Sequence, residues 1–479
     1  MTFKKFPALT TSAALLLAGC GSLAPGGANP PAPPAPVTES SNWKTPGGDV
    51  HWVSADARRD QEAWQAGQWW IFFDDAPLDD LMPRVEVGNQ NLAQMVANVA
   101  QAEALLQQAQ AKLLPNAGLD FSTSRAGRPA RGAAALGASA SWAPDLWGNL
   151  SDAARAQAAN AQASQADLAA ARLSAQGSFA QGYFAVREAD AELALLDEII
   201  EGYARAETMT QNRYDNGIAP HTDLLQAQST LASARASRQQ LAASRAASEH
   251  ALALLLGLPP AEFSLPPAPW RAAAPQAPAL LPSELLLRRP DIAAAERAVA
   301  AANANIGVAR AAYFPSIGLS ASAGRSSAGL SKLLSAPTLA WSLGLSAAQT
   351  LFDGGAREGA VAQARAQHAA ATASYRQTVL AAIGQVEDGM TNLAAQAGQI
   401  EQTRIAANAA QGAAERMMNS YQAGLAAYTD VVTAQAAALS ARRSLLQLQM
   451  QRQQTAIGLI QALGGGWVAP WAEAKNSPE

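Results

Sequence analysis

Cysteine is almost absent from this chain of 479 residues, because Cys20 is its only one, and no disulfide can therefore form within the chain. The four histidines show no metal-ligand spacing with one another or with that cysteine. Neither a P-loop nor a nucleophile elbow occurs in the sequence. Since nothing resembles an active site, we predict that the protein is not an enzyme and needs neither a metal nor a cofactor.

Charged and aromatic side chains are also scarce, at 15% and 6% of the residues. The formal net charge is −4, so no basic surface indicates a nucleic-acid partner. Most of the remaining residues are Ala, Leu, Gln and Ser. This composition is low in charge for a soluble globule, and it favours long helices that pack closely on small residues.

The N-terminus has the features of a secretory signal, namely a basic start at Lys4 and Lys5 followed by a short apolar run. We predict a signal peptide at residues 1–19, which is too short to span a bilayer. The tetrapeptide Leu17-Ala-Gly-Cys20 resembles a bacterial lipobox, and this resemblance implies that Cys20 becomes a lipidated first residue carrying acyl chains such as palmitate. A signal that merely contains a cysteine is the alternative.

The residues after the lipobox indicate where and how the chain is anchored. Gly21 stands where an Asp would signal retention elsewhere, and by resemblance to lipoprotein sorting patterns this favours the outer membrane. Residues 20–37 are rich in Pro, Gly and Ala and cannot form a core, so we predict a lipidated, extended tether. Residues 38–77 are predicted to form an N-terminal extended segment.

One sequence pattern occurs twice, at Tyr214-Asp-Asn-Gly-Ile-Ala-Pro-His-Thr-Asp223 and at Tyr421-Gln-Ala-Gly-Leu-Ala-Ala-Tyr-Thr-Asp430, an offset of 207 residues. The pairing continues beyond it, and a second set of pairs lies at an offset of 200. These pairs include Gln228/Gln435, Arg235/Arg442, Leu92/Ile292, Val99/Val299 and Pro115/Pro315. We therefore predict an internal duplication, with repeats at 78–258 and 283–466, a connector or equatorial segment at 259–282, and a tail at 467–479.

The apolar period changes from 3.6 to 2 after Pro115 and after Pro315, where each proline ends a helical pattern. The alternation predicts two strands in each repeat, near residues 116–124, 134–143, 316–324 and 338–348. Each strand has an apolar face and a face of small polar residues, as expected of a membrane-crossing β-barrel. A soluble, half-buried hairpin would show the same alternation.

The number of strands bears on the choice between a membrane-crossing β-barrel and a soluble hairpin. Four strands cannot close a barrel, and an open sheet edge is not tolerated in lipid. If the strands cross a membrane, several chains must share one barrel. Two chains would supply eight strands, a barrel that side chains fill, whereas three would supply twelve and begin to leave an open lumen.

Glycines follow the second strand of each repeat, at Gly148 and in Asp353-Gly354-Gly355. We predict that these positions turn the chain from strand to helix, and the alternative for Asp353 to Gly355 is an anion site at a helix N-terminus. Proline-free helices are predicted next, over about 149–212 and 356–420. At 1.5 Å per residue each would be a rod of about 100 Å. Leu193, Leu196, Ile200 and Tyr203 recur at spacings of three and four, which predicts a narrow coiled-coil seam. The abundant Ala on the other faces permits close neighbours on both sides, as a closed cylinder of helices requires.

Several further motifs suggest a family. They are Trp69-Trp-Ile-Phe-Phe-Asp-Asp-Ala-Pro-Leu78, Leu281-Pro-Ser-Glu-Leu-Leu-Leu-Arg-Arg-Pro-Asp-Ile292, Ala312-Tyr-Phe-Pro-Ser-Ile317, Leu351-Phe-Asp-Gly-Gly355 and Ala462-Leu-Gly-Gly-Gly-Trp467. With the lipobox, they make the chain resemble the TolC-like outer-membrane factors, more narrowly the NodT/OprM-type efflux lipoproteins. The resemblance implies a mainly α fold with a membrane β-barrel contribution, made of internally duplicated helix-hairpin-helix-helix units. It further implies a homotrimer with a 12-stranded β-barrel, four strands per chain, and a long α-helical barrel.

The same resemblance implies a function. The protein would be the outer-membrane exit duct of a tripartite efflux pump, lipid-anchored through Cys20 and extending into the periplasm. Its partners would be a periplasmic adaptor protein and, through it, an inner-membrane RND-type pump. The outer-membrane component of type I protein secretion is one alternative, and a lipid-anchored periplasmic coiled-coil scaffold is another.

In the family, the turns that end the long helices form a periplasmic tip that closes the duct and meets the adaptor. The candidate gate and tip residues here are Tyr214, Gly217, Asp223, Tyr421, Gly424 and Asp430. TolC has an arginine where this chain has Ala426, so we do not expect an Arg-centred gate lock here. The two aspartates have two open interpretations, gating residues or caps of the helices that follow.

Overall fold

The computed structural model describes Trp64, residues 66–126, 131–272, 275, 288–328, 333 and 339–473. The chain divides into two compact units. Unit 1 contains Ala97–Gln165 and Ala293–Thr378, and unit 2 contains Ala166–Ile292, the described part of residues 36–96 and the described part of residues 379–479. Each unit therefore takes elements from both halves of the chain, and neither corresponds to one predicted repeat.

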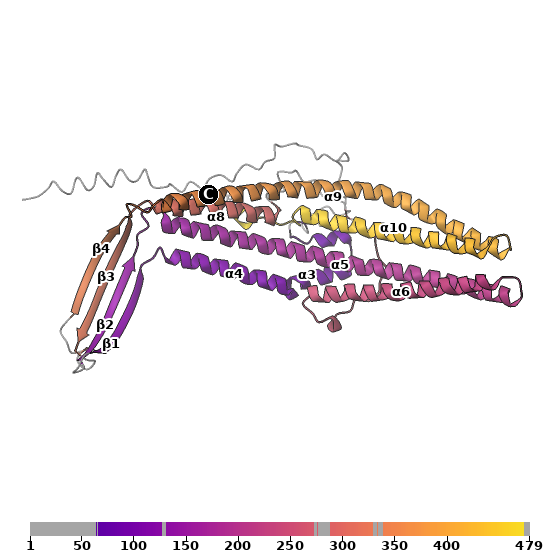
Figure 1. Cartoon of the computed structure of the whole chain (residues 1–479), viewed down its shortest axis with the longest axis horizontal. Helices are drawn as coiled ribbons and strands as arrows, with labels where there is room; N and C mark the ends of the chain where they lie inside the picture. The colour runs from indigo at the N-terminus through magenta and orange to yellow at the C-terminus, as the bar shows by residue number, and fades with distance from the viewer. Residues whose placement is uncertain are drawn as a thin grey trace, which may run out of the picture. The chain divides into compact units, whose positions relative to one another are not determined.

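Unit 1 contains a four-stranded antiparallel sheet in the order β1-β2-β3-β4, whose strands lie side by side in Figure 1. The strands are β1 (Asn116–Ala126), β2 (Arg131–Trp142), β3 (Ser316–Ser327) and β4 (Leu339–Ala348). All four strand predictions are confirmed. The pairing of β2 with β3, for example Trp142 with Leu319, joins the two halves of the chain in one sheet.

The two faces of the sheet differ in chemistry, because successive residues of a strand point to opposite sides. On β4, Trp341, Leu343 and Leu345 share one side, and each is about three quarters exposed at 76%, 76% and 74%. Serines form a row on the other side, where Ser139 pairs with Ser322 and Ser322 pairs with Ser342. The Oγ atoms of Ser322 and Ser342 are 2.9 Å apart.

Two helices of 67 residues each follow the two β-hairpins, α5 (Asn149–Asp215) and α9 (Ala356–Gln422). Their first parts belong to unit 1 and the rest to unit 2. The prediction of two long proline-free helices is confirmed. The shorter helices before the strands are α4 (Gln90–Ala111) and α8 (Pro290–Ala311), and both end before the prolines that precede β1 and β3.

Unit 2 adds the helices that return from the ends of α5 and α9. These are α6 (His221–Leu255) and α10 (Tyr428–Ala462), so α5–α6 and α9–α10 form two helical hairpins. The smaller elements are η1 (Trp69–Phe73), α3 (Ala76–Gly88), η2 (Pro260–Glu262) and α11 (Pro470–Glu473). None of the described helices is both long enough and apolar enough to cross a membrane.

The predicted extended segment 38–77 differs in its described end, where η1 and the start of α3 are helical. The reason is burial, because Trp69, Trp70 and Phe73 are at most 5% exposed within the core of unit 2. Trp69 also donates from Nε1 to Gln176 Oε1 at 3.1 Å. A short helical turn brings these aromatic side chains to one side, which an alternating strand cannot do.

Glycine caps end both return helices, as the sequence predicts. Gly257 and Gly464 have φ of +70° and +87°, a left-handed conformation that glycine adopts without steric cost. Gly257 also lies against the C-terminus of α3. A Cβ on Gly257 would lie 2.0 Å from the carbonyl oxygen of Gly88, so only glycine fits there.

A buried ionic network holds the chain after α6 in unit 2. Arg187 and Arg245 both pair with Asp190, whose side chain is 4% exposed. The two guanidinium groups also donate to the carbonyl oxygens of Pro266 and Leu265, at 2.7 and 2.6 Å. Residues 265 and 266 are thus held against α5 and α6 by charged groups that are buried together.

Candidate functional site

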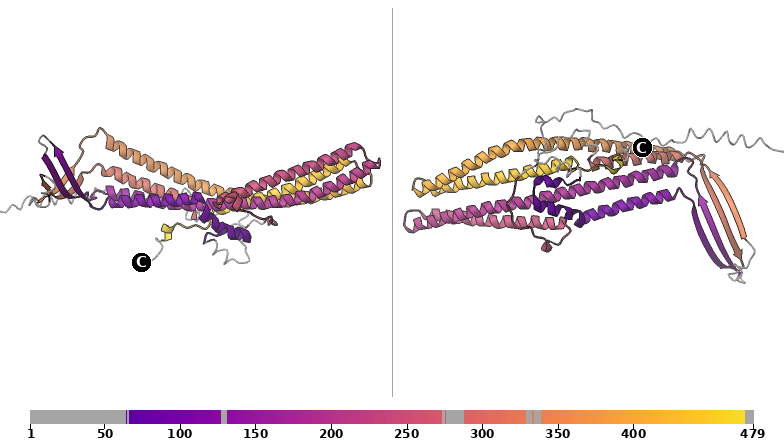
Figure 2. Two further views of the ribbon diagram at one scale, coloured as in Figure 1. Left: turned by 90° about the horizontal axis from the view of Figure 1, so that it is seen from below. Right: turned by 180° about the vertical axis from the view of Figure 1, so that it is seen from behind.

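The turns that end α5 and α9 lie at the same end of unit 2 in all three views of Figures 1 and 2. They have the same hydrogen bonds. Gly217 N donates to Tyr214 O at 2.9 Å, and Gly424 N donates to Tyr421 O at 3.0 Å. The two glycines have φ of +72° and +77°. A side chain would meet no atom within 4 Å there, but it would strain the backbone.

The two tyrosines that begin the turns have different surroundings. Tyr421 is 2% exposed, and its ring meets that of Tyr428 edge-on at 5.3 Å between centroids. These rings form a small apolar cluster with Ala206, Ala227 and Val431, which comes from both hairpins. Tyr214 is 39% exposed and lies against the ring of His221. The two copies of the turn are therefore not equivalent.

Arg213 joins the two hairpins. Its Nη1 donates to the carbonyl oxygen of Tyr421 at 2.9 Å, and its guanidinium carbon lies 4.6 Å from the centre of the Tyr421 ring. The sequence prediction missed this residue. The available signal was a difference between the copies, because Arg213 corresponds to Ser420 at the offset of 207. Although an Arg-centred lock was not expected, the tip contains an arginine that contacts both the backbone and the ring of Tyr421.

The aspartates of the two turns also differ. The Asp430 carboxylate accepts from Ala427 N at 3.3 Å, so it caps the start of α10. Ala427 has no side-chain acceptor and cannot complete a reciprocal capping box. Asp223 has Pro220 at the matching position, and proline has no backbone N–H to offer. The cap found at Asp430 therefore cannot form at Asp223.

Asp223 instead influences a tyrosine of the second hairpin. The pKa of Tyr428 is raised to about 12, chiefly by burial and then by the nearby Tyr421, Tyr203, Asp223 and Glu207. The charge of Asp223 thus disfavours the tyrosinate, because like charges repel. Asp223 and Asp430 are brought to the same end of unit 2, but they have different contacts.

The predicted strand-to-helix bends lie in unit 1. Gly148, Gly354 and Gly355 all have positive φ, at +78°, +64° and +92°. Asp353 accepts from Gly355 N at 3.0 Å and from Arg357 N at 3.2 Å, and it pairs with the Arg357 guanidinium. The Asp353 carboxylate thus occupies the N-terminus of α9, the place where an anion would bind. These contacts support a cap rather than an anion site.

Asp145 has the corresponding role at the first bend, which the sequence prediction did not assign. Its carboxylate accepts from Leu150 N at 3.1 Å and from Ser151 N at 2.7 Å. Burial opposes its ionisation, but these hydrogen bonds outweigh burial and lower the pKa of Asp145. Next to it, Trp147 stacks on Phe314 at 4.9 Å and donates to Pro315 O. The bend is thereby fixed to the chain before β3.

Cys20 lies outside the described residues. Among the residues that the structure describes, no group of three or more His, Cys, Asp or Glu side chains could hold a metal ion.

Comparison with known proteins identifies the fold. Residues 81–258 and 281–465 match the family described as outer membrane efflux protein. The chain is 31% identical to the cation efflux system protein CusC of Escherichia coli over 58% of this chain and 61% of that protein. It is 32% identical to the outer membrane protein OprJ of Pseudomonas aeruginosa, over 57% of this chain and 58% of that protein. The chain thus spans about three fifths of the length of the curated relatives it matches.

Solved structures are similar over more of the chain. The outer-membrane channel OprN matches with a TM-score of 0.78 and 29% identity, over 83% of this chain and 92% of that one. The outer membrane protein VceC of Vibrio cholerae matches with a TM-score of 0.77 and 28% identity, over 84% of this chain and 99% of that one. The predicted TolC-like fold class is confirmed.

Proposed function

This chain belongs to the outer membrane efflux protein family and is a protein of the bacterial outer membrane, and from this premise we propose that it forms the exit duct of a tripartite efflux pump. The duct passively conducts drugs or other small molecules from the periplasm across the outer membrane. The observation that carries this proposal is a four-stranded sheet whose two outer strands have no second strand partner in the described part of the chain, which also builds two long helical hairpins. The names of the relatives favour efflux over type I protein secretion.

Closure of the barrel requires other copies of the chain. Neither β1 nor β4 has a second strand partner among the described residues, and free edges are not tolerated in lipid. In the proposed homotrimer, β1 of one chain pairs with β4 of the next, giving twelve strands and an open lumen. The exposed Trp341, Leu343 and Leu345 then face lipid, and the serine row faces the lumen. A soluble periplasmic scaffold gives no reason for these exposed apolar side chains.

The tip is the proposed gate. The Arg213–Tyr421 contact and the Tyr421–Tyr428 cluster join the two hairpins, so opening by their separation must break both. Gly217 and Gly424 form the tight turns that a periplasmic adaptor would engage, and Tyr214 and Asp223 lie beside them. Asp430 acts as a helix cap. The energy for transport comes from an inner-membrane RND-type pump coupled through the adaptor.

The anchor and the repeats complete the proposal. Cys20 carries the lipid, residues 20–37 are the tether, and the duplicated units are residues 78–258 and 283–466. Gly148, Asp353, Gly354 and Gly355 bend each repeat from strand to helix. The matching order of elements in the two halves supports the duplication, since each half has a helix, two strands, a 67-residue helix and a return helix.

Dye accumulation tests this function. Cells that lack the gene but keep the cognate adaptor and pump should accumulate ethidium, and the wild-type gene should restore efflux. Purified protein in planar bilayers should give discrete, ohmic conductance steps without nucleotide. Unchanged ethidium accumulation on deletion and restoration would refute the efflux assignment.

A further inference from the structure

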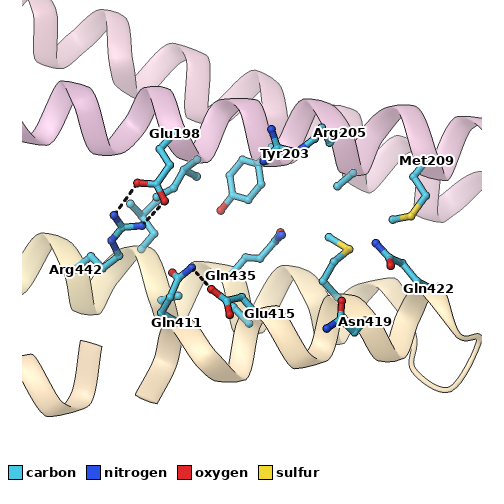
Figure 3. Close-up of a pocket in the computed structure, with 17 residues that line it drawn as sticks. Glu198, Tyr203, Arg205, Met209, Gln411, Glu415, Asn419, Gln422, Gln435 and Arg442 are labelled. Carbon is cyan, nitrogen blue, oxygen red and sulfur yellow. Dashed lines mark hydrogen bonds and ion pairs between the residues drawn. The ribbon is translucent and has the colours of Figure 1, made fainter. Parts of the chain in front are cut away.

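A cavity of about 380 Å³ lies between the two helical hairpins of unit 2. It is next to the apolar cluster of Ala206, Ala227, Tyr421, Tyr428 and Val431, which we call the tip cluster. Its walls come from three helices, α5, α9 and α10. Figure 3 shows Tyr203 and Met209 of α5 on one side and Gln435 of α10 on the other. Cavities of about 300–1,000 Å³ are the size that holds small organic molecules.

One part of the cavity wall is apolar. Tyr203, Ala206 and Ala438 are 6%, 1% and 4% exposed, so they are held in fixed positions by the surrounding helices. Met209 and Met418 also line the space, and both pack against the tip cluster. Thioether side chains adapt to the shape of a ligand and make favourable contacts with aromatic rings. These walls suit the apolar body of a small molecule.

The charged groups of the lining balance in number, since Glu198 and Glu415 are matched by Arg205 and Arg442. Glu198 accepts two hydrogen bonds from Arg442, at 2.9 and 2.8 Å, and this pair lies at one end of the cavity (Figure 3). The carboxylate of Glu415 accepts from Gln411 Nε2 at 2.9 Å. With two acidic and two basic side chains, the lining carries no net charge. The lining favours a neutral molecule over an ion.

Gln435 provides the polar contact that is not yet satisfied. Its Oε1 is buried, and no donor among the described residues reaches it. A buried carbonyl oxygen without a donor is unfavourable, because it has lost its bonds to water. A ligand with an O–H or N–H group would supply this bond.

We propose that the cavity binds a neutral, amphipathic small molecule that carries one hydrogen-bond donor. The apolar body lies against Tyr203, Met209 and Met418, and the donor bonds to Gln435 Oε1. The site is built by the helices of one chain, so the proposal does not depend on the proposed function.

The first repeat supplies a matched control position. Gln228 corresponds to Gln435 at the offset of 207, and it is exposed on α6. Replacing either glutamine by methionine keeps the length of the side chain and removes the amide. Only the change at position 435 removes the acceptor from the cavity.

The experiment measures equilibrium binding of 2-naphthol to the full chain in lipid nanodiscs, with uptake by empty nanodiscs subtracted. The wild-type protein and Gln228→Met should bind 2-naphthol saturably, with one molecule per chain. Gln435→Met should weaken this binding about fivefold, the effect of one ordinary hydrogen bond. Ala438→Leu, which fills part of the cavity, should weaken it further. 2-Methoxynaphthalene, which has no donor, should bind wild type and Gln435→Met equally.

Circular dichroism of each variant shows whether it is folded, and Gln435→Met alone decides the outcome if Ala438→Leu does not fold. Uptake by the wild-type protein that is no greater than that of empty nanodiscs would overturn the proposal. Equal affinity of wild type and Gln435→Met for 2-naphthol would also overturn it.

Discussion

Replacing Arg213 by methionine removes a charged contact between the two hairpins while keeping an apolar stem of similar length. The change deletes the 2.9 Å hydrogen bond to Tyr421 O and the contact at 4.6 Å with the Tyr421 ring. A hydrogen bond from a charged donor contributes about 1.5–3 kcal/mol, and a partly exposed cation–π contact adds about 0.5–1 kcal/mol. Both favour hairpins that stay together.

Desolvation of the Arg213 guanidinium reduces the stabilisation that these two contacts provide. Its Nε is buried and has no hydrogen-bond partner among the described residues, so the native contact carries a desolvation cost that methionine does not. We therefore expect a net loss of about 1–2 kcal/mol per chain, which shifts the ratio of separated to joined hairpins about 5- to 30-fold. The proposed gate should open more often by a factor of this order.

Single-channel recording in planar bilayers measures the effect as the fraction of time spent open. Arg235→Met is a matched control, since Arg235 is an exposed arginine on α6. Tyr421→Phe is a second control, because the Tyr421 hydroxyl is buried without a hydrogen-bond partner among the described residues. Both controls should leave the open fraction unchanged. The reasoning is refuted if Arg213→Met behaves like Arg235→Met, or if Tyr421→Phe opens the duct.

The remaining predictions concern other parts of the chain. Gly217→Val with Gly424→Val should distort both turns, because both positions have positive φ, and should abolish ethidium efflux while the assembly persists on native gels. Loss of the assembly would instead show that the turns are needed for folding. Asp430→Ala should lower stability by about 1 kcal/mol through loss of its cap, whereas Asp223→Ala should stay within about 0.5 kcal/mol; equal thermal shifts would contradict this difference. Asp190→Ala leaves Arg187 and Arg245 buried without their shared carboxylate, and it should lower the free energy of unfolding in denaturant by about 3 kcal/mol or more. A decrease below about 1 kcal/mol would mean that the network contributes little to stability. Burial, with the nearby Glu192, raises the pKa of Glu188 from 4.5 to about 7, so the contribution of Glu188 to stability is full below pH 4.5 and is lost as the pH rises through 7. The melting temperature of the wild-type protein at pH 5 should therefore exceed its value at pH 8 by more than it does in Glu188→Gln. An equal difference in the two proteins would exclude the effect.

The strands and long helices could be predicted because their signals repeat along the chain. A period of 2 after each proline indicated the strands, and proline-free helical patterns indicated α5 and α9. Their bounds agree with the expected positions to within a few residues. The two units could not be predicted in this way, because each is assembled from distant segments of both repeats.

The turns could be located by comparing the repeats, but that comparison favours residues present in both copies. Arg213 was missed because its counterpart is Ser420, and its partner is a backbone carbonyl that every residue possesses. The difference between Asp223 and Asp430 could have been predicted from the sequence, since Pro220 has no backbone N–H to donate while Ala427 has one. The cavity at Gln435 depends on the spacing of three helices, which no local pattern contains.

The most direct test of the account is a cryo-electron microscopy reconstruction of the purified full chain in lipid nanodiscs. We predict a threefold assembly in which β1 of each chain is hydrogen-bonded to β4 of the next, so that twelve strands enclose one lumen. A particle in which a single chain covers its own β1 and β4 edges would contradict the proposed duct.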